Sequence, residues 1–390
     1  MISFEEAYRI VMNHVTVLPS ERVNMMDSLG RILADDIISD VDMPPFNKSA
    51  VDGFACRMAD KNHDLEVIET IPAGKTPEFM VSEGKCSRIM TGAMLPEGSD
   101  CVIMVEDTQI LDNGMMRPAK KQESLNICYQ GEDIKAGDKV LSTGTLIKPQ
   151  HIAVLAAAGA VNPKVSKQIH VGILSTGDEL MEPEHIPSAS KIRNTNAYQL
   201  MAQVTAAGAI PQYGGIAADT EISLSAMLSD SLDRNDVVLL TGGVSMGEFD
   251  YVPAAMENLD IEILFKSVAV QPGRPTVFGK WGNQFIFGLP GNPVSSFVLF
   301  EVLVKPFLLK MMGSREEPVV LHLPLGTDFT RKKSTRKSLI PVRIENGLVI
   351  PVDYHGSAHI NAYTQANGIL TIEIGKTRLG KGEIADVRSI

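Results

Sequence analysis

Residues 171–180 read VGILSTGDEL, a short run of buried-type residues that ends in two hydroxyls and two carboxylates. Such a run predicts a buried strand followed by a polar loop. Further along the chain, Asn196–Ala207 has helical spacing and ends before Gly208, and Asp236–Leu240 is another buried strand. This alternation of strands and helices predicts a parallel sheet covered by helices, in an α/β domain.

The rest of the chain divides around this α/β pattern. The first segment has apolar residues at helical spacing, and the next consists of short apolar runs broken by glycine and proline. The last segment alternates β-prone runs with glycine turns. We therefore expect a discontinuous helical domain at 1–40 and 142–170, a β-rich second domain at 41–141, the α/β domain at 171–317 and a small C-terminal β domain at 318–390.

Several helices are expected from their local patterns. Ala7, Ile10 and Val11 have helical spacing, and Leu29, Ile32 and Leu33 repeat it. His151–Gly159 follows a proline, and Val294–Leu309 reads as one long apolar helix entered through Pro293.

Composition limits the classes of function. A chain of 390 residues is long enough for several domains, and its net charge of −11 argues against a surface for nucleic acid or anionic membranes. The four cysteines are far apart along the chain and form no C-x-x-C pair, so we expect neither a zinc site nor a disulfide framework. The N-terminus lacks a secretory pattern, and no apolar run approaches membrane-spanning length. We expect a cytoplasmic protein.

In parallel α/β sheets, ligands bind beyond the carboxyl ends of the strands, so the loops at those ends are the candidate site. The first offers Ser175, Thr176, Asp178 and Glu179, and Asp219 follows the second strand. By itself the first loop also fits a solvated turn with helix-capping acids. The third loop, residues 241–251, has glycines that let backbone amides approach an oxyanion closely; its candidates are Gly242, Gly243, Ser245 and Asp250.

Two more loops suggest anion binding. Gln271-Pro272-Gly273-Arg274-Pro275 holds a guanidinium between two prolines, which fits a rigid turn as well as an anion clamp. Residues 288–296 lead into the long apolar helix, and they fit either a well-capped helix start or a site for phosphate. The candidates there are Pro290, Asn292, Pro293 and Ser295.

These loops bring acids and oxyanion donors to one edge of one sheet. Carboxylates beside a phosphate site imply Mg²⁺, which prefers a few carboxylates plus phosphate oxygens. No Gly-Lys-Ser/Thr phosphate loop is present. The residues alone therefore predict a Mg²⁺-dependent enzyme that acts on a phosphorylated substrate.

Several motifs in chain order resemble the MoeA family of molybdopterin molybdenumtransferases, which is related to the E domain of gephyrin. They are STGDEL at 175–180, TGGVSMG at 241–247 with Asp250-Tyr251, and PGNP at 290–293. The first half carries PPFNKSAVDG at 44–53, RIMTGA at 88–93 and GEDI at 131–134, and the last part carries HGS at 355–357. The resemblance covers essentially the full chain.

The resemblance implies a reaction. Adenylylated molybdopterin and molybdate bind, the pyrophosphate bond is hydrolysed with Mg²⁺, and molybdenum cofactor and AMP are released. It also implies a homodimer with a shared site, and leaves open whether other cofactor-assembly proteins dock.

The resemblance also implies roles for individual residues, at the positions where this chain matches the family's motifs. Asp52, Thr91 and Asp133 come from one subunit, and Glu179, Asp219 and Asp250 from the α/β domain of the other, where these three acids are the candidate Mg²⁺ ligands. Arg343 and Ser357 come from the last domain and, with Arg274 and Gln271, are expected to bind anions. Gln271 and Arg274 stand where many relatives carry lysine, so the anion loop itself is less positive.

Two other functions fit parts of the sequence. A molybdopterin adenylyltransferase uses a similar sheet domain, but the additional domains argue against it. A gephyrin-like dimeric scaffold is expected to carry a fused second sheet domain and a long linker, and this chain has neither.

Overall fold

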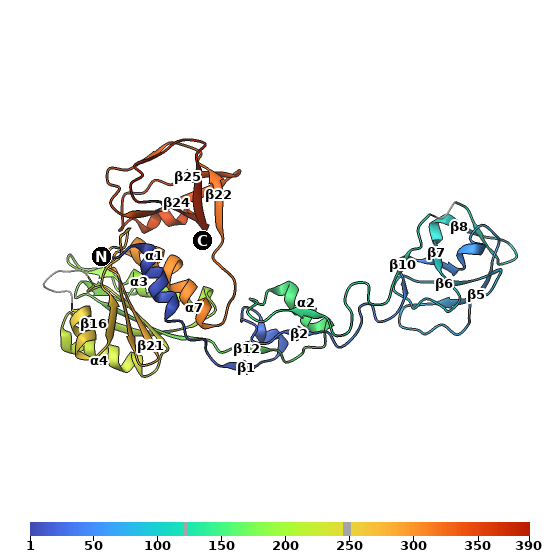
Figure 1. Ribbon diagram of the computed structural model, residues 1–390, viewed down its shortest axis with the longest axis horizontal. Helices are drawn as coiled ribbons and strands as arrows, with labels where there is room; N and C mark the ends of the chain where they lie inside the picture. The colour runs from blue at the N-terminus through green and yellow to red at the C-terminus, as the bar shows by residue number, and fades with distance from the viewer. Residues whose placement is uncertain (121–122, 245–250) are drawn as a thin grey trace.

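A six-stranded sheet in the order β16-β13-β17-β21-β20-β18 forms the centre of the larger end of the computed structural model, which describes residues 1–120, 123–244 and 251–390 (Figure 1). The first four of these strands run parallel, and β20 and β18 are added antiparallel. The strands are β13 (His170–Thr176), β16 (Ile210–Ala217), β17 (Val237–Thr241), β18 (Glu262–Phe265), β20 (Val277–Trp281) and β21 (Gln284–Leu289). The α/β sheet predicted from the sequence is thus confirmed, whereas its antiparallel edge was not foreseen.

Helices cover both faces of this sheet because its strands are apolar on both sides. Successive residues of β17 alternate between two cores: Val237 and Leu239 face one, and Val238 and Leu240 face the other. The first core is covered by α1 (Phe4–Asn13), α3 (Thr195–Ala206), α6 (Pro293–Leu299) and α7 (Lys305–Met311). The second is covered by α4 (Glu221–Leu232) and α5 (Val252–Asn258).

The long apolar helix expected over Val294–Leu309 is not continuous. A π-helical turn, Phe300–Val304, separates α6 from α7. Pro306 in α7 has no N–H to donate to the carbonyl of Val302, and its ring disfavours a regular α-helical turn before it. The apolar pattern was interpreted correctly, but the proline breaks the hydrogen-bond ladder.

The expected helical character of residues 1–40 is confined to α1. That helix packs against the core of the α/β sheet through Ala7 and Val11. Ile32 and Leu33 instead form single bridges to Leu146 and Val165, next to Gly30 with a φ of 77°. Apolar spacing over one short segment does not distinguish a helix from a buried irregular chain.

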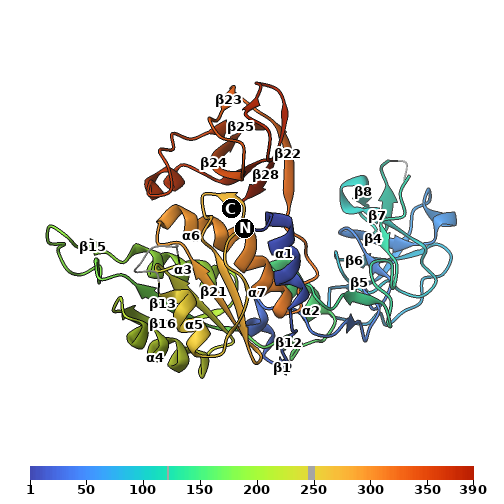
Figure 2. The same cartoon turned by 60° about the vertical axis from the view of Figure 1, so that its left-hand side comes forward.

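Between the α/β part and the β-rich part lies a small connecting unit (Figures 1 and 2). Two separate pieces of chain build it, and their apolar side chains share one core. Its elements are β1 (Ser20–Arg22), a 3₁₀ turn at Met25–Ser28, β2 (Ile37–Ile38), β11 (Lys139–Leu141), α2 (Pro149–Ala157) and β12 (Lys164–Ser166). Strand β1 pairs with β12 and β2 with β11, so the chain leaves and returns side by side.

The β-rich part is centred on a four-stranded sheet in the order β5-β6-β4-β7 at the far end of the molecule (Figure 1). Its strands are β4 (Gly53–Cys56), β5 (Glu66–Ile71), β6 (Lys85–Ile89) and β7 (Cys101–Met104), with β3 (Lys48–Ser49), β8 (Thr108–Ile110), β9 (Met116–Pro118), β10 (Ile127–Cys128) and 3₁₀ turns at Met58–Asp60 and Val105–Asp107 around them. The cysteines, distant in sequence, are not all distant in space: Cys56 and Cys101 pair across β4 and β7 with their Sγ atoms 3.4 Å apart, and all four thiols are free.

The C-terminal β domain stands on the α/β part (Figure 2). Its sheet has the order β19-β24-β26-β28-β22, with β25 beside β24. The strands after the α/β part are β22 (Val320–Pro324), β23 (Phe329–Thr330), β24 (Lys337–Glu345), β25 (Leu348–Pro351), β26 (Gly368–Ile372), β27 (Arg378–Leu379) and β28 (Ile384–Ser389), with a 3₁₀ turn at Ile360–Thr364. The edge strand β19 (Val270–Gln271) comes from the α/β part, and β14 (Leu180–Met181) and β15 (Ile192–Arg193) form a separate pair there.

The proposed boundaries of the four domains stay a prediction, with the helix α1 lying against the α/β part. In the described parts of the chain, no helix combines the length and apolar character needed to cross a membrane.

An aromatic cluster should dominate the stability of the α/β part. Phe278 contacts Phe287 with ring centroids 4.7 Å apart and also lies against Phe307. We expect Phe278→Ala to lower the free energy of unfolding of this part by roughly 3–5 kcal/mol, because it leaves a cavity in a packed core. Denaturant unfolding followed by fluorescence of the single tryptophan, Trp281 on the same strand, measures this.

Phe79→Ala is the matched control, because the Phe79 side chain is 54% exposed. It should change the same transition by less than about 0.5 kcal/mol. Equal effects of the two substitutions would contradict the assignment of the core.

Candidate active site

One cavity lies at the carboxyl ends of the parallel strands. Its volume is about 710 Å³, and it is bounded by the loops after β13, β16, β17 and β21 and by the start of α3. The predicted site residues that line it are Thr176, Glu179, Asp219, Gly242, Gly243, Pro290, Asn292 and Pro293. We call it the acidic cavity, because Glu179 and Asp219 are its carboxylates and Arg193 is its one basic residue in the described part of the chain.

Hydrogen bonds hold Asp219 in place at this cavity. The Thr176 hydroxyl donates to Asp219 Oδ1 over 2.6 Å, and the Asp178 amide donates to Asp219 Oδ2 over 3.2 Å. In return, the Asp219 amide donates to Asp178 Oδ1, also over 3.2 Å. The loops after β13 and β16 are therefore fixed to each other through two carboxylates.

Glycines allow the loops to approach closely. A Cβ atom at Gly242 would lie 2.3 Å from the Thr176 carbonyl oxygen, and one at Gly177 would lie 2.6 Å from Glu179 Oε2. Any side chain at either position would displace a loop or the Glu179 carboxylate.

Two asparagines at the start of α3 brace the same loops. Asn194 caps the helix, accepting from the Ala197 amide over 3.3 Å, and also accepts from the Ser175 hydroxyl. Asn196 donates to the Thr241 hydroxyl and to the Gly291 carbonyl, both over 2.7 Å. The bracing role of Asn196 depends on loops distant in sequence, so helical spacing alone did not indicate it.

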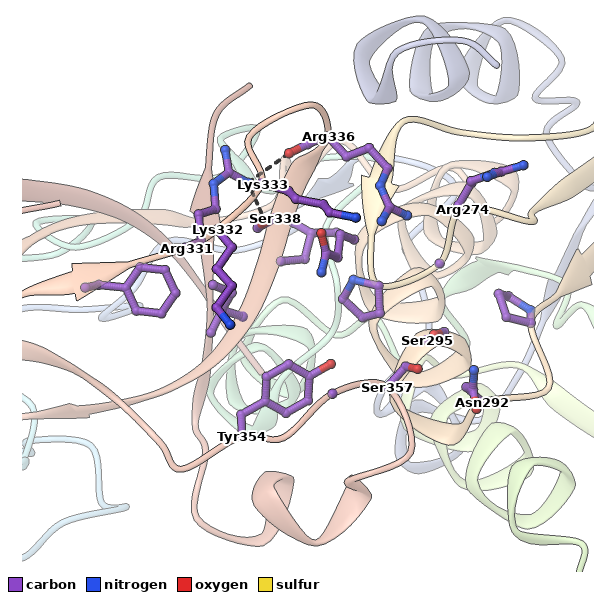
Figure 3. A pocket seen from close by; sticks show the side chains of 18 of the residues that line it. Arg274, Asn292, Ser295, Arg331, Lys332, Lys333, Arg336, Ser338, Tyr354 and Ser357 are labelled. Atoms are coloured by element: carbon purple, nitrogen blue, oxygen red, sulfur yellow. Dashed lines mark hydrogen bonds between the residues drawn. The ribbon is translucent and has the colours of Figure 1, made fainter. Parts of the chain in front are cut away.

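A second cavity, of about 800 Å³, lies where the C-terminal β domain meets the α/β part. Of the predicted residues it contains Gln271, Arg274, Ser295 and Ser357, and it shares Pro275, Pro290 and Asn292 with the acidic cavity. The two cavities therefore adjoin. Figure 3 shows Lys332, Lys333 and Arg336 extending from one side of this second cavity, with Arg274, Ser295, Asn292 and Ser357 on the other.

This basic cavity has no acidic residue among the described residues that line it. Its basic residues are Arg274, Arg331, Lys332, Lys333 and Arg336. Burial raises the pKa of Tyr354, which also lines it, to about 12, so the phenol stays protonated and able to donate a hydrogen bond at neutral pH. Such a set of donors suits an oxyanion.

Sequence reasoning missed the basic residues that the C-terminal β domain contributes. The signal was the run Arg331-Lys332-Lys333-Ser334-Thr335-Arg336-Lys337, a dense group of positive charges in a chain of net charge −11. Arg343, expected to bind anions, instead lies exposed on β24 outside both cavities, where it pairs with Glu345 over 2.8 Å.

Asp52 and Thr91 are brought together, but on the β-rich part. The Thr91 amide and hydroxyl donate to Asp52 Oδ1 over 2.7 and 2.8 Å, and these bonds hold the pKa of the Asp52 carboxyl below its ordinary value. Asp133 is exposed, and none of its hydrogen bonds in the described structure reaches either residue. Asp52 and Thr91 flank the sheet of the β-rich part. In space, this sheet lies at the opposite end of the molecule from β13 and β21 of the α/β part (Figures 1 and 2).

Ser175, also predicted, lines neither cavity. Ser175 is fully buried behind Thr176 and bonds to Asn194. Ser245 and Asp250 lie outside the described residues.

The acidic cavity can be tested for its fit to Mg²⁺. No group of three or more acids, histidines or cysteines suited to a metal occurs among residues 1–120, 123–244 and 251–390. Glu179 and Asp219 nevertheless offer two carboxylates to one cavity. Mg²⁺ usually binds proteins through one or two carboxylates and takes its other oxygens from water and phosphate, so this donor set fits.

Three family models match the chain in order. Residues 2–159 match the MoeA N-terminal region (domain I and II), residues 172–310 match the model described as "Probable molybdopterin binding domain", and residues 322–390 match the MoeA C-terminal region (domain IV).

Full-length relatives agree with these matches. Molybdopterin molybdenumtransferases from Staphylococcus aureus and Staphylococcus epidermidis are each 34% identical to this chain, over 99% of it and 95% of their own length. The crystal structure of the molybdopterin biosynthesis MoeA protein from Pyrococcus horikoshii OT3 is 30% identical and covers 100% of both chains, with a TM-score of 0.86.

The Asp52–Thr91 pair gives a direct test. We expect Thr91→Val to raise the pKa of Asp52, because the hydroxyl bond to the ionised carboxylate is lost. The pKa should remain somewhat below the ordinary value, since the backbone amide still donates. Carboxyl-carbon NMR titration of the protein measures the shift.

Thr91→Ser is the control, since it keeps the hydroxyl and should leave the Asp52 titration in place. A pKa unchanged in Thr91→Val would show that the hydroxyl does not bind Asp52 in solution.

Proposed function

The chain belongs to the MoeA family of molybdopterin molybdenumtransferases, and from this premise we propose how its two adjoining cavities perform the transfer. It is a transferase of molybdenum cofactor biosynthesis that inserts molybdenum into molybdopterin. The observation that carries our proposal is the contact between an acidic cavity and a basic cavity along Pro275, Pro290 and Asn292.

We assign the metal oxyanion to the basic cavity. Molybdate is a dianion, so it needs fixed donors and is repelled by carboxylates. Arg274, Ser295 and Ser357 offer such donors on the α/β side of this cavity, and Arg336, which directly precedes β24, faces them. Molybdate is a substrate here, bound beside its acceptor.

Adenylylated molybdopterin is the proposed second substrate, with its pterin part in the acidic cavity. Thr176, Gly242, Gly243 and Asn292 bound this cavity and provide backbone and side-chain donors. The shared rim leads from there to the basic cavity, so a ligand that is long and anionic can reach both.

Mg²⁺ is the proposed cofactor, held by Glu179 and Asp219, with Asp250 as a further candidate outside the described residues. When bound, Mg²⁺ supplies charge neutralisation for phosphate oxygens. The Thr176 hydroxyl and the Asp178 amide orient the Asp219 carboxylate, and Glu179 orients the attacking water. That water adds its oxygen to one phosphorus of the pyrophosphate bond, the bridging P–O bond breaks, and AMP leaves.

A homodimer with a shared site is part of the proposal. Asp52, Thr91 and Asp133 lie on the part of the chain remote from both cavities, so within one chain they cannot contact a ligand there. In a dimer, the β-rich part of one subunit would face the cavities of its partner. Docking of other cofactor-assembly proteins is a separate question, which a binding experiment with those proteins addresses.

We also propose a cytoplasmic location, supported by four free thiols of which Cys56, Cys86 and Cys101 are buried.

The two alternative functions have less support. A lone sheet domain, as in an adenylyltransferase, would lack the basic cavity, because residues 329–357 of the C-terminal β domain form most of its lining. A purely scaffolding role does not explain why hydrogen bonds from Thr176 and Asp178 fix the Asp219 carboxylate in a cavity that adjoins a cationic one.

The reaction is tested by AMP release. Purified protein supplied with adenylylated molybdopterin, Mg²⁺ and molybdate should release AMP, and Glu179→Gln and Asp219→Asn should slow the release on the order of 100-fold or more. Glu184→Gln, an exposed acid outside both cavities, serves as the control and should match wild type. AMP release that ignores molybdate, or variants as fast as wild type, would overturn the proposal.

The shared site is tested by mixing two inactive subunits. Asp52→Asn and Glu179→Gln, each inactive alone, should regain activity when co-expressed, because a hybrid dimer has one site with neither substitution. Random pairing makes half the dimers hybrid, so about a quarter of the sites are intact. Co-expression of Asp219→Asn with Glu179→Gln should restore nothing, since both residues line the same cavity; absence of rescue in the first pair would count against a shared site.

A further inference from the structure

The basic run of the C-terminal β domain is held at both ends. The Arg331 guanidinium donates to the carbonyls of Lys376 and Glu373, over 2.6 and 2.5 Å, and to that of Arg336 over 2.8 Å. At the other end, the Lys337 ammonium is ion-paired with Glu5 and, over 2.9 Å, with Glu373. Both cations therefore serve the fold, and they fix the loop between them.

Lys332 and Lys333, within that loop, serve no such purpose. Both are exposed, both line the basic cavity, and neither makes a hydrogen bond or ion pair with any residue in the described part of the chain. Each brings a positive charge into a cavity that already contains Arg274 and Arg336. Like charges in one cavity repel, so this arrangement favours a bound anion.

The cavity has more charge and more room than one tetrahedral oxyanion requires. Four cations, Arg274, Lys332, Lys333 and Arg336, exceed the charge of a dianion. If each oxygen of a tetrahedral oxyanion takes the volume of a water molecule, about 30 Å³, its four oxygens fill on the order of 120 Å³. The cavity measures about 800 Å³. A second anionic group fits beside the first.

The donors divide between the two walls. Arg274, Ser295 and Ser357 lie on the α/β side, and the Ser295 side chain is 2% exposed, as expected of a rigid donor. Lys332 and Lys333 extend from the opposite wall on flexible stems, with the Tyr354 phenol on the same domain. Lysine ammonium groups on flexible stems adapt to a chain of phosphates, whereas the buried Ser295 hydroxyl suits a compact ion.

We propose that Lys332 and Lys333 form a phosphate-binding arm that holds one phosphate of the nucleotide-bearing substrate's phosphoanhydride, whose other phosphate reaches across the shared rim toward Glu179 and Asp219, while the oxyanion binds at Arg274 and Ser295. This assignment rests on the proposed function, because it takes the substrate to be an adenylylated phosphate. Under this assignment, the two lysines bind substrate in that reaction. The phosphate group and the oxyanion then occupy the cavity at the same time.

The test uses inorganic pyrophosphate as the probe, with the full-length protein in magnesium-free buffer of fixed ionic strength. Calorimetry should show wild-type protein binding pyrophosphate with saturating molybdate already present. The double variant Lys332→Ala/Lys333→Ala should raise the Kd for pyrophosphate at least about tenfold, since charge-assisted hydrogen bonds are lost. Its Kd for molybdate should stay within about threefold of wild type.

Lys376→Ala/Lys381→Ala is the matched control, because it removes two charges from the same domain at positions that do not line the cavity. It should leave both Kd values near wild type. Competition between pyrophosphate and molybdate in wild type overturns the inference, as does an equal effect of the two double variants. Molybdate-dependent AMP release by wild type, measured in parallel, separates failure of this inference from failure of the proposed function.

Discussion

Main-chain pairing between the α/β part and the C-terminal β domain is the constraint on which the basic cavity depends. The two-residue strand β19 leaves the α/β part and runs parallel to β24, with Val270 beside Lys337 and Gln271 beside Ser338. The Lys337 amide donates to the Ala269 carbonyl over 2.9 Å, and the Ala269 amide donates to Ile2 on the other side. The loop from Gln271 to Pro275 is thereby set against the basic run by backbone geometry.

The charge pattern of the site follows from that pairing. The α/β part alone presents carboxylates at the ends of its strands, where a cation is needed before a phosphate can bind. The neighbouring wall contributed by the C-terminal β domain is cationic. A chain of net charge −11 thus holds a small region of opposite sign, where low-dielectric walls on two sides strengthen the attraction for small anions. The net charge excludes broad polyanion surfaces without excluding this cavity.

The features predictable from the sequence were those that depend on local pattern. Buried strands such as residues 171–174 and 236–240 have strong apolar runs, and parallel strands bring their carboxyl ends to one edge, so the loops with Thr176, Asp219 and Gly242 were predicted together and do line one cavity. What depends on register was not predictable. Arg343 and Glu345 are two residues apart on β24, so they share a face of the strand and pair with each other, and neither lines a cavity of the site. Arg336, seven positions earlier, lies before the strand begins and lines the basic cavity instead.

The Asp52–Thr91 pair supports the proposal that the site is shared between two chains. An exposed carboxylate is ordinarily solvated and free to turn, but two bonds from Thr91 fix this one and favour its ionised form. Its backbone is fixed too: a Cβ atom at the adjacent Gly53 would lie 2.0 Å from the Ile103 carbonyl oxygen, so β4 can lie against β7 only with glycine there.

Fixing a charged group costs conformational entropy, and neither Asp52 nor Thr91 packs into the cores of its own sheet. A ligand or protein surface that meets Asp52 from outside would gain from this order, because the carboxylate is already oriented before contact. The elongated connection through the small unit of β1, β2, β11 and β12 holds this carboxylate far from its own cavities, which is the arrangement a site shared between two copies requires.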